Sequence, residues 1–457
     1  MKRVVISASF TVEVIAQPMQ FLLETIAYDG EIVFAAYNQI FQELYNPTSL
    51  IRANDNGVNV IVVRFEDWLH YQKNKQTFSA SRQVIEQNVN DLISGIANVP
   101  GHKVPCIVCV AAPSPDLRGC PADLQLHEQL EEFFVASLQD IKNVYVIRST
   151  EIDALYPVAN YYDAHTNQMG HIPYTEEYFA ALGAIIVRKI FAVTTKPFKV
   201  ILSDCDDTLW RGTCGEVGAK VRIDTSAKWL QSFLVAKKNE GMVLCLCSKN
   251  ERGSVDDVFA RNGDMILSPE DIATSRINWE PKASNVKSLA KELNLGMDSF
   301  VFLDDSQAEI KELQMQCPEV LSVCLPRDIA RIPKFIQHLW VFDRTRITKE
   351  DTERNKFYKE NAKRQQHQSE VSSLKEYIAS LALVIDIAAP NEALIPRLAQ
   401  LSQRTNQFNS TSRRYTEANL TDLLASTESI CRYVKVSDRY GDYGIVGLVT
   451  GAYRADR

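Results

Sequence analysis

The sequence predicts an α/β protein with two doubly wound parallel-sheet domains, followed by a smaller mixed α+β unit. Short apolar strands alternate with helical stretches over residues 1–195 and again over 196–345, which is typical of parallel sheets covered on both faces. A segment with Thr, Lys and Pro at 193–197 separates these two runs. A charged connector at 348–370 opens the last unit, 346–457.

The expected elements follow from hydrophobic periodicity and from turn residues. In the first domain we expect strands at 4–7, 31–35, 58–64, 104–111 and 144–147, and helices at 17–27, 81–97 and 123–138. In the second we expect strands at 198–204, 242–248 and 299–305, and helices at 226–241, 254–263 and 284–296. In the third we expect a helix at 372–381 and strands at 382–387 and 444–453.

Composition excludes several classes of protein. The 457 residues are 46% hydrophobic and 23% charged, which is ordinary for a globular protein and argues against disorder or a fibrous repeat. The net charge of -7 and the absence of a long basic run predict no nucleic-acid partner and no membrane association. The ten cysteines show no disulfide framework, so we expect a cytoplasmic protein, with the CxxC at 106–109 packed in the core.

Polar residues with complementary chemistry end several strands of the second domain. The run 204–208 (DCDDT) follows one strand, Ser248 ends the next, Lys282 opens a helix, and the acidic pair 304–305 follows a later strand. Carboxyl ends of parallel strands meet at one edge of a sheet, so these residues are expected to share a crevice. Acidic residues often end strands, and a lone DxDxT is a weak signal, but four such elements in this order predict a phosphoryl-transfer site.

This ordered set resembles the haloacid dehalogenase (HAD) superfamily of phosphohydrolases and phosphotransferases. The resemblance implies that Asp204 is the nucleophile and that Asp206 is the general acid and base. It implies a phosphate-binding group of Thr208, Ser248, Lys249, Asn250 and the catalytic Lys282. It implies a Mg²⁺ site made by Asp204, the backbone carbonyl of Asp206, Asp304, and Asp305 either directly or through water.

The spacing of these motifs predicts an open site. About 40 residues separate Thr208 from Ser248, and about 34 separate Ser248 from Lys282. Neither interval can hold a sizeable cap domain. We therefore expect the site to be covered by a neighbouring domain or by a large partner such as a carrier protein, since catalysis benefits when water is excluded.

Longer motifs narrow the resemblance. The segments 206–216, 247–251 and 278–282, together with 405–409, 413–415 and 438–442, resemble the FkbH-like glyceryltransferase/phosphatase family of polyketide biosynthesis, and the likeness runs from about residue 197 to the end of the chain. It implies that 1,3-bisphosphoglycerate donates a glyceryl group to the phosphopantetheine thiol of an acyl carrier protein, with removal of the 3-phosphate. The partners would then be that carrier and polyketide synthase modules.

An acyl phosphate can be attacked by a thiolate, so a cysteine beside the phosphate site is expected. Cys214 lies between glycine-rich turns, whereas Cys205 is expected to point away from the aspartates. We favour Cys214 over Cys205 as the acyl carrier; the third alternative is that both pack in the core and the carrier thiol attacks unaided. In the last unit, Arg404, Asn406 and Gln407 are expected to contact phosphate, the glyceryl group or the pantetheine arm.

The chain departs from the family pattern at several positions. Asp207 stands where Asn is usual and Arg211 where Gly is usual, and both changes add charge near the phosphate site. The chain stops soon after a strand, whereas family members continue through an acyltransferase-like (GNAT-like) tail, so we expect the third unit to be an incomplete GNAT-like domain cut from a larger synthase.

The first domain resembles an SGNH-type hydrolase only in the order of its candidate catalytic residues, with Ser first and Asp and His last. Ser7 and Ser9 follow the first strand, and Asp163, His165 and His171 come near the domain's end, but the Gly-Asp-Ser block is absent. We favour a degenerate scaffold, lid or docking domain over an active serine hydrolase. For the whole chain, the alternatives to the glyceryltransferase are a plain HAD-type Mg-dependent phosphatase of a small phosphate ester and a non-enzymatic scaffold.

Overall fold

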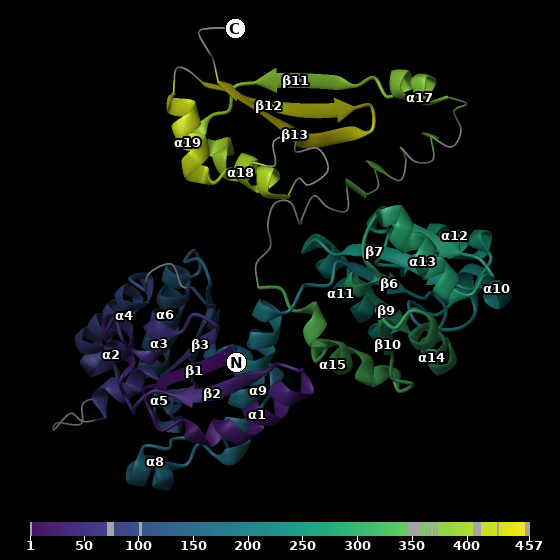
Figure 1. Ribbon diagram of the computed structural model, residues 1–457. Helices are drawn as coiled ribbons and strands as arrows, with labels where there is room; N and C mark the ends of the chain where they lie inside the picture. The colour runs from purple at the N-terminus through teal and green to yellow at the C-terminus, as the bar shows by residue number, and fades with distance from the viewer. Residues whose placement is uncertain are drawn as a thin grey trace. The chain divides into compact units, whose positions relative to one another are not determined.

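The computed structural model describes residues 2–70, 77–99, 103–345, 373–404, 413–426 and 429–452, together with parts of 357–371 (Figure 1). These residues form two compact units. The first contains residues 2–197 and 334–345, and the second contains the remaining described residues from 198 onward. Among the described residues, no helix combines the length and apolar character needed to cross a membrane.

The first unit is built on a five-stranded sheet in the order β2-β1-β3-β4-β5, with every neighbouring pair parallel. This confirms the predicted α/β class. The strands are β1 Lys2–Ala8, β2 Gly30–Phe34, β3 Gly57–Val63, β4 Cys106–Val110 and β5 Val144–Ile147. The helices are α1 Ala16–Thr25, α2 Ile40–Tyr45, α3 Leu50–Ala53, α4 Arg82–Ala97, α5 Pro115–Gly119, α6 Pro121–Leu138, α7 Ser149–Leu155, α8 Ala164–Gly170 and α9 Glu176–Thr194.

The central strands β1, β3 and β4 of this sheet are buried on both faces. Because side chains alternate along a strand, Val60 packs into the core under α1 and α9, whereas Ile61 packs into the opposite core with residues of α4 and α6. The same alternation separates Cys106 and Cys109, which lie in different cores. The two thiols of the CxxC therefore share no site, and both are core residues as expected.

Residues 334–345 belong to the first unit, whereas the boundary expected from the sequence places residues up to 345 in the second domain. Arg188 of α9 makes two contacts with Asp343, from Nε to Oδ2 at 2.5 Å and from Nη2 to Oδ1 at 2.7 Å. The rings of Phe191 and Trp340 pack with centroids 6.2 Å apart. These contacts join residues about 150 positions apart, which local periodicity does not report.

The second unit contains a parallel sheet in the order β10-β9-β6-β7-β8. Its strands are β6 Val200–Ser203, β7 Val243–Ser248, β8 Thr274–Ile277, β9 Phe300–Asp304 and β10 Leu321–Cys324. The main helices are α10 Cys214–Val217, α11 Thr225–Asn239, α12 Arg252–Arg261, α13 Lys282–Leu293 and α14 Gln307–Gln316; α15 Ile332–Gln337 begins in this unit and continues into the first. The chain runs from β6 to β7 and β8 on one side and returns to β9 on the other, so the strand order reverses between β6 and β9. Ligands bind at such switch points in open α/β sheets.

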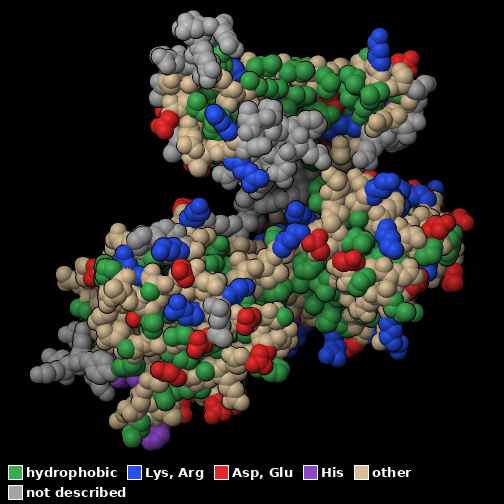
Figure 2. All heavy atoms as spheres, in the orientation of Figure 1, with side chains coloured by type: hydrophobic (Ala, Val, Ile, Leu, Met, Phe, Trp, Pro, Cys, Tyr) green, Lys and Arg blue, Asp and Glu red, His purple; other side chains and the backbone are tan. Residues whose placement is uncertain are grey.

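The C-terminal residues form an antiparallel sheet in the order β11-β12-β13. Its strands are β11 Val384–Ala388, β12 Ser429–Asp438 and β13 Gly441–Ala452, and its helices are α17 Leu374–Ser380, α18 Ile395–Arg404 and α19 Glu417–Ala425. Strand β12 was not among the expected elements, because its apolar pattern is interrupted by Arg432 and Lys435. Helices α18 and α19 cover one face, with Leu398 and Leu420 fully buried. Val384, Ile385 and Ile387 of β11 are each about 60% exposed, and Figure 2 shows hydrophobic side chains gathered over this part.

Candidate active site

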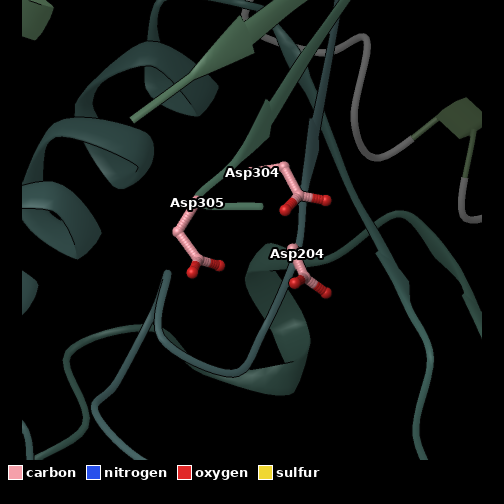
Figure 3. Close-up of side chains that lie close together, drawn as sticks. All are labelled: Asp204, Asp304 and Asp305. Carbon is pink, nitrogen blue, oxygen red and sulfur yellow. The ribbon is translucent and has the colours of Figure 1, made fainter. Parts of the chain in front are cut away.

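Three carboxylates converge at the switch point of the second sheet. Asp204 follows β6, Asp304 is the last residue of β9, and Asp305 comes next. One carboxylate oxygen from each lies within 4.8 Å of the others, and Figure 3 shows the three side chains facing one space. The backbone N–H of Asp204 donates to the carbonyl of Leu303 at 3.0 Å, so sheet hydrogen bonds fix the relative position of the two strand ends.

The chemistry of this cluster fits a divalent cation. Asp304 is fully buried and Asp204 is nearly so. The Oδ1 atom of Asp204 has no hydrogen-bond partner among the described residues, although it is buried. Buried anionic oxygens need compensation, and all-oxygen donor sets suit Mg²⁺. Asp204, Asp304 and Asp305 could therefore hold a magnesium ion.

Lys282 places a positive charge beside the carboxylates of Asp204 and Asp304. It is the first residue of α13 and is 4% exposed. Its Nζ atom lies 2.5 Å from Asp304 Oδ2 and 3.2 Å from Asp204 Oδ2. Burial lowers the pKa of Lys282, but Asp204 and then Asp304 more than offset this effect, so the pKa is raised and the ammonium stays charged.

The carboxylates titrate above their usual range. Burial raises the pKa of Asp204 to about 6; Lys282 works against this shift, and Asp304 adds to it. Burial also raises the pKa of Asp305, with the charges of Asp204 and Asp207 adding to it. A bound cation would reverse these shifts, because it favours the ionised carboxylates.

Asp206 is held by three N–H donors. Its Oδ1 atom accepts from the Trp210 indole at 2.7 Å and from the Cys214 backbone at 3.0 Å, and its Oδ2 atom accepts from Asn250 at 3.1 Å. Trp210 was not among the expected site residues, although an indole four residues after an aspartate was an available signal. The carboxylate of Asp206 is therefore oriented by its neighbours, as a general acid and base requires.

The expected phosphate-binding residues divide into two groups. Ser248 is buried at the end of β7, and Thr208 lies 3.4 Å from Asp305 through its hydroxyl, so both lie at the cluster's edge. Asn250 donates to Asp206 and also to Ser248 Oγ at 3.0 Å, so it orients these two side chains. Lys249 pairs with Glu309 of α14 at 2.7 Å and is directed to that helix.

Neither cysteine has the surroundings of a nucleophile. Cys205 is fully buried, and Cys214 is 1% exposed with its Sγ donating to Asn250 Oδ1 at 3.4 Å. Burial, followed by the charge of Asp206, raises the pKa of the Cys214 thiol to about 12. Burial also raises the pKa of Cys205 well above the normal thiol value. Reactive cysteines have depressed pKa values and partial exposure, so the geometry favours the alternative in which both cysteines are packing residues.

The residues expected from the last unit are only partly visible. Asn406 and Gln407 lie outside the described residues. Arg404 ends α18, and its side chain also lies outside the described part.

In the first unit, Ser9 and His171 do not contact each other as a hydrolytic pair does. Ser9 Oγ donates to Asp67 Oδ2 at 2.6 Å and accepts from the Arg64 backbone at 3.0 Å. His171 Nε2 lies 3.0 Å from Asp67 Oδ1. Asp163 accepts from the backbone N–H groups of His165 and Thr166 at the start of α8, and the His165 side chain is exposed. Ser9, Asp67 and His171 are all nearly fully buried.

Comparison with known proteins identifies the fold. No protein-family model matches the sequence, and no curated protein matches it significantly. A crystal structure of the N-terminal part of the protein BF1531 from Bacteroides fragilis, containing a phosphatase domain and complexed with Mg, superimposes with a TM-score of 0.65. The alignment covers 76% of this chain and 94% of that chain at 22% sequence identity. The two chains share a fold.

Proposed function

We propose that this protein is a magnesium-dependent phosphatase that acts through Asp204. The observation that carries the proposal is the convergence of Asp204, Asp304 and Asp305 on one space, with a buried Asp204 oxygen that has no partner among the described residues. The Mg in the similar B. fragilis structure, which contains a phosphatase domain, supports the same metal here. When bound, the metal would supply charge neutralisation for the phosphoryl oxygens.

The residues of the site have distinct parts in this reaction. The Asp204 carboxylate attacks phosphorus, and the bond from phosphorus to the leaving oxygen breaks. Asp206, oriented by Trp210 and Asn250, gives its proton to that oxygen. Asp206 then takes a proton from the water that hydrolyses the phosphoaspartate, which returns both residues to their first state. Lys282 and Ser248 bind the phosphoryl oxygens.

Hydrolysis of p-nitrophenyl phosphate with and without MgCl₂ tests this proposal. We expect Mg-dependent phosphate release that falls at least a thousandfold in Asp204→Asn and at least a hundredfold in Asp206→Asn. The control is Asp264→Asn, which changes an exposed aspartate of the same domain. Release that persists in Asp204→Asn would contradict the proposal.

The motif resemblance supports a finer proposal, in which the substrate is 1,3-bisphosphoglycerate and the glyceryl group passes to an acyl carrier protein. With both cysteines buried and protonated, the carrier's own thiol attacks the acyl phosphate and releases phosphate. Asp204 then removes the 3-phosphate. The product is D-glyceryl-S-carrier.

This finer proposal can be tested with a holo carrier protein incubated with the enzyme and a bisphosphoglycerate-generating system. The intact mass of the carrier then reports both the acyl transfer and the removal of the 3-phosphate. We expect a glyceryl adduct on the carrier that persists with Cys214→Ala and becomes phosphoglyceryl with Asp204→Asn. Loss of the adduct with Cys214→Ala would restore that cysteine as the acyl carrier. Phosphate release without any adduct would leave the phosphatase alone.

A further inference from the structure

A cavity of about 710 Å³ adjoins the carboxylate cluster. Asp305 of the cluster and Asp207, which follows Asp206, both line it. The rest of its wall comes from the loop after β6, the start of α14, and the segment after β10. A cavity of this size suits a small molecule, so the space can receive the part of a substrate that extends from the reacting phosphate.

Three cationic side chains from different segments line this cavity. They are Arg211 after β6, Lys311 on α14 and Arg327 after β10. Neither Lys311 nor Arg327 forms an ion pair with any described residue, and both are exposed. Lys311 and Arg327 come from separate segments and have no carboxylate partner among the described residues, so both are available to an anion.

Arg211 is positioned more firmly than the other two. Its backbone exchanges hydrogen bonds with Arg222 at 2.8 and 3.1 Å. Its Nε donates to Asp224 Oδ2 at 3.1 Å, and its Nη1 donates to the carbonyl of Asp207. The remaining Nη2 atom is buried and has no hydrogen-bond partner among the described residues. A buried guanidinium nitrogen without an acceptor is costly, and an anionic ligand oxygen would satisfy it.

The start of α14 adds backbone donors to the same wall. Ser306, Gln307 and Ala308 line the cavity, and the first N–H groups of a helix have no acceptor within the helix. Lys311 follows Gln307 by four residues and so lies on the same side of α14. The positive end of the helix dipole and the Lys311 ammonium therefore both attract an anion to this side of the cavity.

We propose that this cavity is an anion subsite that recognises a second acidic group, a carboxylate or a phosphate, on the substrate. The inference rests on the proposed function, because the substrate's other end is the phosphate that reacts at Asp204. Arg211 is paired with Asp224, which leaves Lys311 and Arg327 as the cations of this wall without a carboxylate partner among the described residues. Of the two carboxylates that line the cavity, Asp305 belongs to the cluster that fits the metal. The preferred substrates are therefore small phosphate esters that carry a second acid.

Binding of non-hydrolysable phosphonates separates this subsite from catalysis. Propylphosphonate and 3-phosphonopropionate differ by one carboxylate, and propane-1,3-bisphosphonate carries a second phosphonate instead. Isothermal titration calorimetry of each compound against the full chain with MgCl₂ would measure the preference. We expect at least tenfold tighter binding of one diacid than of propylphosphonate, and the tighter diacid identifies the second group as carboxylate or phosphate.

Variants assign the preference to the cavity. Lys311→Gln combined with Arg327→Gln is expected to reduce the preference at least fivefold. The matched control is Lys291→Gln. Lys291 is an exposed lysine in the last turn of α13 and does not line this cavity. Equal binding of all three phosphonates to the unaltered chain, or a preference that survives in the double variant, would overturn the subsite. A preference for a diacid in a protein that hydrolyses no phosphate ester would leave the subsite standing and contradict only the proposed function.

Discussion

The Nζ atom of Lys282 lies 2.5 Å from Asp304 Oδ2, and both side chains are nearly excluded from solvent. The same ammonium also lies 3.2 Å from Asp204. One buried cation thus faces two buried carboxylates, with Asp305 close by. The site holds excess negative charge that a metal ion would balance.

Replacement of Lys282 by Met should destabilise the metal-free protein. Loss of the only buried cation that contacts Asp204 and Asp304 among the described residues leaves those carboxylates uncompensated, at a cost of about 3–5 kcal/mol. The urea midpoint of the transition that unfolds this domain should fall accordingly, and MgCl₂ should restore part of it. The double variant Lys282→Met/Asp304→Asn should be more stable than Lys282→Met alone; the reverse order would contradict this account.

Removal of divalent metal should abolish phosphate release, and added Mg²⁺ should restore it. In Asp305→Asn the magnesium concentration for half-maximal activity should rise at least tenfold, because one of three clustered carboxylates is lost. Titration of MgCl₂ into EDTA-treated enzyme measures this value. Asp264→Asn serves as the control, and an unchanged magnesium requirement in Asp305→Asn would exclude that residue from the metal site.

Cys205 and Cys214 should resist alkylation in the folded protein. Because burial holds the Cys214 pKa near 12, its thiol stays protonated at pH 8, and the reactive form is the thiolate. Mass spectrometry after iodoacetamide treatment should find Cys120, which is partly exposed, modified well before either buried cysteine. Rapid labelling of Cys214 would instead support its role as acyl carrier.

The Asp67 network of the first unit should make that unit sensitive to acid. Burial raises the pKa of Asp67, but Arg64, and then His171 and Ser9, more than offset this effect, so its pKa lies below the usual value. A lowered pKa in the folded state gives stability that is present above the unfolded-state value of about 3.9 and is lost as the pH falls through the folded-state value.

Asp67→Asn should therefore lower the melting temperature at pH 7, and its difference from the unaltered chain should shrink below about pH 4. Thermal unfolding of the full chain from pH 7 to pH 3 measures both effects. Asp116→Asn, at an exposed position of the same unit, is the matched control. A difference that stays constant with pH would show that Asp67 is not the titrating group.

Most strands and longer helices were predictable, because their periodicities are local. The alternation of β3 and the helical spacing of α4 are visible within each segment. The order of the run 204–208, Ser248, Lys282 and Asp304 also predicted a shared crevice, since carboxyl ends of parallel strands meet at one edge.

The amino-acid sequence by itself determined the α/β class, the chemical character of the site and the strand ends that carry it. Only the tertiary structure decided which groups face one another: that Trp210 orients Asp206, that Cys214 is enclosed, that Asp67 rather than His171 receives the Ser9 hydroxyl, and that Asp343 pairs with Arg188. The physical reason is that periodicity reports the environment of one segment. Contacts across tens of residues, and the burial that shifts a pKa, depend on how several segments pack together.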